Sequence, residues 1–294
     1  MKELKFKVDE SKCIHCGLCV KDCIAKVYEL DENNVPKATG EKRCIACQHC
    51  LAVCPVGAIS VFDKNPDESD KVFAQNPDMI LNLIQSRRSY RFYKNENVEA
   101  DKLQKLKDML SYSPTGCNVH SLHFSFIDDV EVMNEFRNHV NKKVIDALTK
   151  SPIKSVGEKF DIYKKLLLKG EDVIFRGAPN MVVVSNSVKA PCANEDPIIA
   201  LSYFELYAQS MGIATCWCGL AQSCLMFFPE LSKYLQIPDG YQPGYVMLFG
   251  PKDINYTRVI QPEKSPVVSA KKVGFEEKMS FLEKTKRYFW NFIR

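Results

Sequence analysis

The sequence predicts an α+β protein in which a small cysteine-rich domain precedes a larger domain of mixed helices and strands. Two cysteine runs with the same spacing lie in the first 54 residues, and segments with helical and strand periodicity are interspersed after residue 79. The chain has 294 residues, of which 46% are hydrophobic, so it contains enough apolar residues for one large core or two smaller ones.

Charge and hydropathy exclude several classes of protein. The net charge is +4, and Lys and Arg are spread along the chain, so no nucleic-acid-binding face is predicted. No apolar run approaches the roughly 20 residues that a membrane-spanning helix needs, and the N-terminal MKELKFKVDESK lacks the apolar stretch of a signal peptide. We therefore expect a cytoplasmic protein, in which thirteen cysteines indicate metal or redox chemistry rather than disulfides.

Eight of these cysteines form two runs of the pattern Cys-x-x-Cys-x-x-Cys-x-x-x-Cys. In this spacing the first three cysteines hold one iron–sulfur cluster, and the fourth crosses to the other cluster. The sequence thus predicts two [4Fe-4S] clusters, one held by Cys13, Cys16, Cys19 and Cys54, and the other by Cys44, Cys47, Cys50 and Cys23. Structural zinc is the alternative, but zinc sites generally use separated Cys-x-x-Cys pairs.

Residues 1–62 resemble the bacterial two-cluster ferredoxins, with one departure. Pro55 follows Cys54, whereas Ile24 follows Cys23. Each cysteine run is expected to lead through a short helix into a strand, and DENNVPKATGEK between them predicts a hairpin and loop. A domain this small buries too little apolar surface to be stable on its own, so we expect the clusters to stabilise its fold as cross-links. Residues 63–78, with two Asn-Pro pairs and several charges, are predicted to be a linker.

The rest of the chain predicts one domain with an antiparallel-rich sheet flanked by helices. Helical patterns occupy residues 79–88, 101–112, 130–150, 197–212 and 229–237. Strand patterns occupy residues 122–128, 180–187 and 245–250. Residues 150–176 predict a charged, mobile insertion. Neither G-x-G-x-x-G nor G-x-x-x-x-G-K-[ST] occurs, so no dinucleotide-binding Rossmann unit or P-loop is predicted.

Three separated segments of this domain carry candidate binding residues. SRRSYRF at 86–92 gathers cations and a hydroxyl at a helix end, a group that suits a phosphate monoester. Taken alone, such a run is more often a solvated charge cluster. SPTGCNVHSLHF at 113–124 offers backbone groups and Asn118 to a heterocycle, or is an ordinary loop. The third segment is MGIATCWCG at 211–219.

In this order and at these separations, the segments resemble the FMN-dependent nitroreductase family over residues 79–262. The whole chain resembles a ferredoxin–nitroreductase fusion, an arrangement typical of anaerobic bacteria and archaea. The resemblance implies FMN at the interface of an intertwined homodimer. Its phosphate would be held by Arg87, Ser89 and Arg258, its ribityl and pyrimidine region by Arg88 and Arg91, and its ring by Trp217, Cys218 and Gly219, with Thr115, Gly116 and Asn118 approaching from the partner subunit. Cys218 stands where some members have an acidic residue, which leaves nicotinamide use open.

The remaining cysteines and histidines predict no catalytic group. Cys117, Cys216 and Cys218 lie within the three segments, but a free cysteine is usually a small buried hydrophobe. His120 is expected to be structural. We name no catalytic residue, because the resemblance implies that the cofactor carries the chemistry.

The parts together predict an oxidoreductase that passes electrons from the clusters to FMN and on to a small conjugated acceptor such as a nitroaromatic or quinone. The donor would be ferredoxin, flavodoxin or NAD(P)H. One alternative is an electron-transfer or sensing module without turnover, and another is an NAD(P)H-dependent reductase with structural clusters. Residues 263–294 predict an amphipathic tail; packing on protein is favoured over contact with a membrane.

Overall fold

The computed structural model describes residues 3–150, 158–269 and 285. The chain divides into two compact units, Met1–Val259 and Ile260–Arg294. The amphipathic tail predicted over residues 263–294 lies mostly outside the described residues, and the domain boundaries at 62, 78 and 262 stay predictions. Within the described residues, no helix combines the length and the hydropathy that crossing a bilayer requires.

The N-terminal region is built from two short antiparallel strand pairs and two short helices. Strand β1 (Lys7–Val8) pairs with β4 (Ile59–Ser60), and β2 (Tyr28–Leu30) pairs with β3 (Pro36–Ala38). Helices α1 (Leu18–Asp22) and α2 (His49–Ala52) each contain the third cysteine of a run, Cys19 and Cys50. The strand expected after each cysteine run is confirmed, but the short helix lies within the run rather than after it, because the third cysteine of each run is itself helical. Only a few apolar side chains are buried here, among them Leu4, Val27, Leu51, Ile59 and Val61.

The larger part is a four-stranded antiparallel sheet in the order β5-β6-β8-β7. Its strands are β5 (His123–Ile127), β6 (Asn180–Ser187), β7 (Ile213–Trp217) and β8 (Tyr241–Pro251). The buried strands β6 and β8 send alternate side chains to opposite faces, as the two-residue period of a strand requires. Val182 and Met247 enter one hydrophobic cluster, and their neighbours Val183 and Val246 enter the other.

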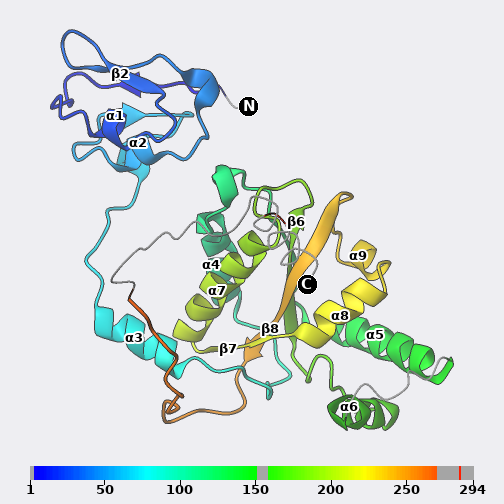
Figure 1. The fold of residues 1–294 in the computed structure, drawn as a ribbon. Helices are drawn as coiled ribbons and strands as arrows, with labels where there is room; N and C mark the ends of the chain where they lie inside the picture. The colour runs from blue at the N-terminus through cyan, green and yellow to red at the C-terminus, as the bar shows by residue number, and fades with distance from the viewer. Residues whose placement is uncertain (1–2, 151–157, 270–284, 286–294) are drawn as a thin grey trace. The chain divides into compact units, whose positions relative to one another are not determined.

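Helices cover both faces of this sheet (Figure 1). On one face lie α4 (Ala100–Met109), which 3₁₀ residues Leu110–Tyr112 extend, and α7 (Glu195–Ser210); on the other lie α5 (Val130–Lys150) and α8 (Gly219–Phe227). Among the described residues, the other α-helices of this part are α3 (Pro77–Ser86), α6 (Glu158–Leu168) and α9 (Leu231–Tyr234). The predicted antiparallel-rich sheet flanked by helices is confirmed.

Helix ends follow the expected chemistry. The Asn76 side chain accepts hydrogen bonds from the Asp78 and Met79 N–H groups and so starts α3. Gly212 has φ +78°, and this left-handed residue ends α7 and lets the chain enter β7 directly.

Two predictions need correction. The insertion at 150–176 contains helix α6, and Leu167, Val173, Ile174 and Phe175 are buried, so this part of it belongs to the core. Its residues 151–157 lie outside the described residues. Strand β7 was not predicted, because its five residues stand between a helix end and a cysteine-rich segment and show no clear alternation.

Candidate functional site

The eight N-terminal cysteines gather around two cavities, four to each. One cavity is lined by Cys13, Cys16, Cys19 and Cys54, and the other by Cys23, Cys44, Cys47 and Cys50. Each triplet is thus joined by the last cysteine of the other run, as the spacing predicts. Four thiols around one cavity fit a cubic cluster held at four corners.

Hydrogen bonds to the sulfurs repeat between the two cavities. The Val27 N–H donates to Cys23 Sγ at 3.4 Å, and the Ala58 N–H donates to Cys54 Sγ at 3.2 Å, in both cases from four residues downstream. The second cavity has an additional side-chain partner, because the Tyr28 hydroxyl lies 3.3 Å from Cys50 Sγ. Such bonds to cluster sulfurs influence the reduction potential. Among the described residues, no group of three His, Cys, Asp or Glu side chains is arranged to hold a single metal ion.

The second candidate site lies where the segment after α3 runs beside β7. Ser89 and Thr215 form a parallel bridge, and the Tyr90 N–H donates to the Thr215 carbonyl at 2.8 Å. The Arg88 guanidinium reaches the Arg258 carbonyl at 3.5 Å. The first and third predicted segments therefore meet in one place, beside the Arg258 backbone, and Arg87, Arg88 and Arg91 form the arginine cluster of this site.

Arg176 also belongs to this site, although no sequence motif marks it. Burial raises the pKa of the Cys216 thiol, and the guanidinium groups of Arg91 and Arg176 act in the opposite direction, so both lie near this sulfur. Arg176 has φ +53°, an uncommon conformation for a residue with a side chain. It directly follows the buried Ile174 and Phe175, which fix the backbone at this point.

The residues predicted to face the flavin ring surround the junction of β7 and α8. Trp217 is half-buried, its ring lies 5.3 Å from that of Tyr245, and Gly219 is exposed. The Cys218 side chain turns away from solvent: its thiol donates to the Ile174 carbonyl at 3.2 Å and accepts from the Ala221 N–H at 3.4 Å. This sulfur therefore caps α8, and only the Cys218 backbone is left to meet a ligand.

The middle segment is held at the opposite end of α7. The Gly116 N–H donates to Asp196 Oδ1 at 3.0 Å, and Asp196 lies in the first turn of the helix. Gln209, in its last turn, holds the backbone of Arg88. These two positions are thirteen residues apart, about 20 Å along an α-helix. Thr115, Gly116 and Asn118 of one chain therefore lie well away from the arginine cluster of that chain.

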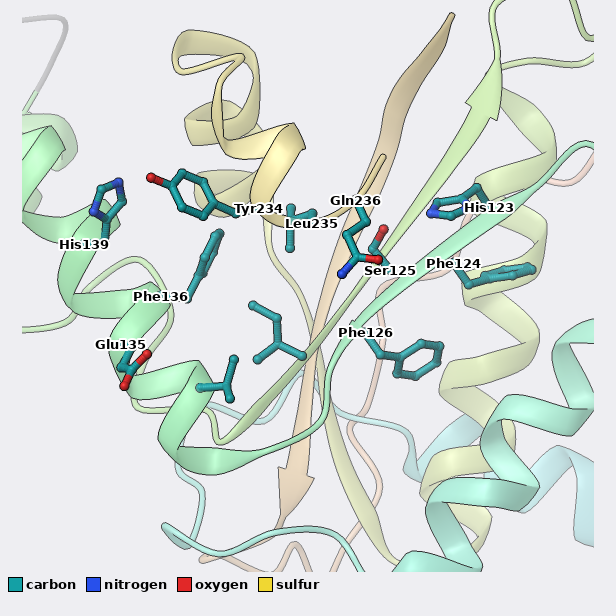
Figure 2. Close-up of a pocket in the computed structure, with 12 residues that line it drawn as sticks. His123, Phe124, Ser125, Phe126, Glu135, Phe136, His139, Tyr234, Leu235 and Gln236 are labelled. Carbon is teal, nitrogen blue, oxygen red and sulfur yellow. The ribbon is translucent and has the colours of Figure 1, made fainter. Parts of the chain in front are cut away.

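A groove runs along the outer edge of β5 (Figure 2). Its lining includes His123 and Ser125 from β5, Phe136 and His139 from α5, and Tyr234. The His139 and Tyr234 rings are 5.3 Å apart. Strands β5 and β7 are opposite edges of the sheet, about 14 Å apart at the usual strand spacing. The groove is thus separate from the arginine cluster, and none of the predicted cofactor-binding residues lines it.

Comparisons with known proteins match two separate parts of the chain. A family model described as "Nitroreductase family" matches residues 84–251, and one described as "4Fe-4S dicluster domain" matches residues 6–61. The chain is similar to a nitroreductase with bound FMN from Desulfitobacterium hafniense DCB-2, at 26% identity and a TM-score of 0.53 over 67% of this chain and all of that one.

The curated relatives match short stretches of this chain. A ferredoxin from Thermococcus litoralis is 36% identical over 59 residues, which cover 20% of this chain and 98% of the ferredoxin. A ferredoxin from Pyrobaculum islandicum is 47% identical over 53 residues, 18% of this chain and 49% of its own length. The chain spans only 16% of the length of the archaeal-type glutamate synthase [NADPH] from Dehalococcoides mccartyi, to which it is 30% identical over 82 residues, 27% of this chain.

Proposed function

Because this chain belongs to the nitroreductase family and carries an N-terminal 4Fe-4S dicluster ferredoxin domain, we propose that its clusters deliver electrons to FMN for reduction of a small conjugated acceptor. It is an FMN-dependent oxidoreductase with iron–sulfur electron transfer. A nitroaromatic or a quinone is the proposed acceptor class. One observation carries the proposal: the same chain holds both kinds of site. Two cavities are each lined by four cysteines, and an arginine cluster lies beside an exposed glycine and a half-buried tryptophan.

The residues present suit FMN. Arg87 and Ser89, with Arg258, would donate hydrogen bonds to its phosphate, because guanidinium forks match phosphate oxygens. Arg88 and Arg91 would meet the ribityl and pyrimidine region, with Arg176 adding positive charge there. Positive charge on that side stabilises the negative charge of a reduced ring.

The ring would lie against the backbone of Trp217, Cys218 and Gly219. A glycine at the exposed position lets a planar ring approach the chain closely. Bound FMN accepts electrons singly and delivers them in pairs, which joins one-electron clusters to the two-electron reduction of an organic molecule. The eight cysteines are the proposed cluster ligands, in the two sets that line the two cavities.

We propose a homodimer as the active form. The loop carrying Thr115, Gly116 and Asn118 is held about 20 Å along α7 from the segment that carries Arg88, so it is better placed to serve the site of a second copy. Exposed apolar side chains support such an association. Met79, Leu81 and Ile84 on α3 are between 51% and 72% exposed, and α3 packs beside α7.

The test is anaerobic reduction followed by visible spectroscopy. The purified protein is titrated with reduced ferredoxin and, separately, with NADPH and NADH, and the cluster and flavin absorbances are followed. We expect ferredoxin to bleach both chromophores, and a nitroaromatic or quinone to restore them with turnover. Variants Cys16→Ala and Cys47→Ala, one in each proposed ligand set, are expected to lose rapid reduction of FMN by ferredoxin.

Two outcomes would contradict the proposal. Rapid flavin reduction by NAD(P)H with clusters left oxidised would place electron entry at the nitroreductase domain. Full reduction without turnover of any acceptor would favour an electron-transfer or sensing module.

A further inference from the structure

A buried carboxylate stands behind the arginine cluster. Glu205 lies in the middle of α7, where its neighbours Leu201, Phe204 and Ala208 are fully buried. Its side chain is only 6% exposed, whereas the Arg87 side chain beside it is 37% exposed. Burial of a charged group is unfavourable unless its oxygens are hydrogen-bonded or paired. The position therefore requires specific partners.

Both carboxylate oxygens have such partners, and they come from two segments far apart in the sequence. Oε1 lies 3.2 Å from Arg87 Nη1 and accepts from Thr215 Oγ1 at 3.5 Å. Oε2 accepts from the Trp217 indole N–H at 3.0 Å. One side chain thus contacts a proposed phosphate ligand and the residue proposed to lie beside the flavin ring.

Gln209, one helical turn further on, fixes the same two segments through other groups. Its side chain accepts from the Arg88 N–H at 3.1 Å and donates to the Arg88 carbonyl at 2.8 Å. The amide also lies 2.6 Å from Thr215 Oγ1. Residues four apart on a helix share one face, so Glu205 and Gln209 form a polar stripe that holds the Arg87–Arg88 segment against β7.

From this geometry we propose that Glu205 is the positioning residue of the FMN phosphate site. Its carboxylate holds Nη1 of the Arg87 guanidinium, which leaves the other N–H groups of that side chain for the phosphate. The other carboxylate oxygen accepts from the Trp217 indole N–H, and glutamine at this position keeps one oxygen for that bond. The inference rests on the proposed function, since it assumes that this site takes FMN.

Charge repulsion alone predicts that removing the Glu205 carboxylate strengthens FMN binding, whereas the positioning role predicts that it weakens it. The direction of the change in FMN affinity therefore distinguishes the two. A carboxylate close to a phosphate repels it, so neutralising Glu205 would strengthen FMN binding if Glu205 had no positioning role. If Glu205 orients Arg87, neutralising it frees the guanidinium to adopt many rotamers and weakens FMN binding.

The experiment compares FMN with riboflavin, which has the same ring and ribityl chain but no phosphate. The full-length protein with its clusters is freed of flavin, and dissociation constants for both flavins are measured by fluorescence quenching. We expect Glu205→Gln to weaken FMN binding about tenfold or more and to change riboflavin binding less than twofold. Trp217→Phe is the matched control: it leaves the pair of Arg87 with Glu205 intact, so it should change both affinities by the same factor.

A double-mutant cycle with Arg87→Gln completes the test. Because Glu205 acts through Arg87, Glu205→Gln should have almost no further effect on FMN affinity in the Arg87→Gln background. Glu205→Asp, which keeps the charge but shortens the side chain, carries the same test if the glutamine variant does not fold. It should weaken FMN binding selectively as well.

Three results overturn the inference while leaving the proposed function intact. They are tighter FMN binding by Glu205→Gln, equal loss of FMN and riboflavin affinity, and independent, additive effects of the Glu205 and Arg87 substitutions. Failure of the wild-type protein to bind FMN would overturn both the inference and the proposed function.

Discussion

Replacing Tyr28 by phenylalanine removes one hydroxyl from the cavity lined by Cys23, Cys44, Cys47 and Cys50. That hydroxyl lies 3.3 Å from Cys50 Sγ. A cysteine that ligates iron has no proton to donate, so the tyrosine would be the donor. The ring is buried and stacks against Phe6 at 4.4 Å, a contact that phenylalanine preserves. The substitution therefore removes a hydrogen bond with little change in packing.

The size of the effect follows from the energy of the lost bond. A hydrogen bond to a charged acceptor contributes about 1.5–3 kcal/mol. It is stronger when the cluster carries an extra electron, and only that difference changes the potential. If about a third to a half of the energy is such a difference, the potential of this cluster falls by roughly 20–60 mV, since 59 mV corresponds to a tenfold change for one electron. The cluster held by Cys13, Cys16, Cys19 and Cys54 should not change.

The assay is a redox titration followed by electron paramagnetic resonance, in which the two reduced clusters are separated by their spectra and potentials. Phe6→Leu is the control, because it alters packing against the Tyr28 ring and leaves the hydroxyl in place. A potential that rises in Tyr28→Phe would refute the reasoning. Equal shifts of both clusters, or an equal shift in the Phe6 variant, would refute it too.

Three further perturbations test the packing at Gly244, the burial of the Cys218 thiol and the hydrogen bond between Gly116 and Asp196. A Cβ added by Gly244→Ala would overlap the Pro197 ring. We expect a loss of about 1–3 kcal/mol in the free energy of unfolding, measured as a lower midpoint in thermal melts. An unchanged melt would contradict the close contact between Gly244 and Pro197. Burial raises the pKa of the Cys218 thiol from 9.0 to about 12. As pH rises, the unfolded chain therefore loses this proton before the folded chain does, and the free energy of unfolding should fall between about pH 9 and pH 12. Over this range the urea midpoint of Cys218→Ser should fall less steeply than that of the wild type, and parallel curves would contradict the raised pKa of Cys218. Asp196→Ala leaves the Gly116 N–H without its acceptor and should reduce the free energy of unfolding by about 1–3 kcal/mol. Asp196→Asn retains an acceptor oxygen and should reduce it less. Equal losses in urea unfolding would show that this hydrogen bond does not stabilise the fold.

Much of the fold could be predicted from the sequence because its signals are local. The spacing within each cysteine run is set by a tight loop around a cluster, so the two sets of four could be assigned from a few neighbouring residues. The longer helices and the buried strand β6 show clear periodicity over eight residues or more. Strand β7 has only five residues, and its place at the sheet edge depends on pairing with β8, which no local pattern encodes.

The site depends on contacts between distant segments, and those were only partly predictable. Glu205 and Gln209 stand in a stretch that reads as a mostly apolar helix, and their partners Arg87 and Arg88 are more than a hundred residues away. A usable signal was present: two polar residues four apart interrupt the apolar face of a buried helix. Such a pair predicts a polar contact between the helix and the segment packed against it, although it does not identify that segment.

Helix α7 organises both parts of the proposed cofactor site, and this makes the dimer testable by complementation. Asp196 holds the loop proposed to serve the partner's site, whereas Glu205 supports the arginine segment of its own chain. In a mixed dimer of an Asp196→Ala chain and a Glu205→Gln chain, one site would have an intact arginine segment and an intact partner loop. We therefore expect about one FMN per tagged and purified mixed dimer, at an FMN concentration that leaves both parent dimers largely empty. If the loop served its own chain, each site would contain one lesion and the mixed dimer would bind no better than its parents.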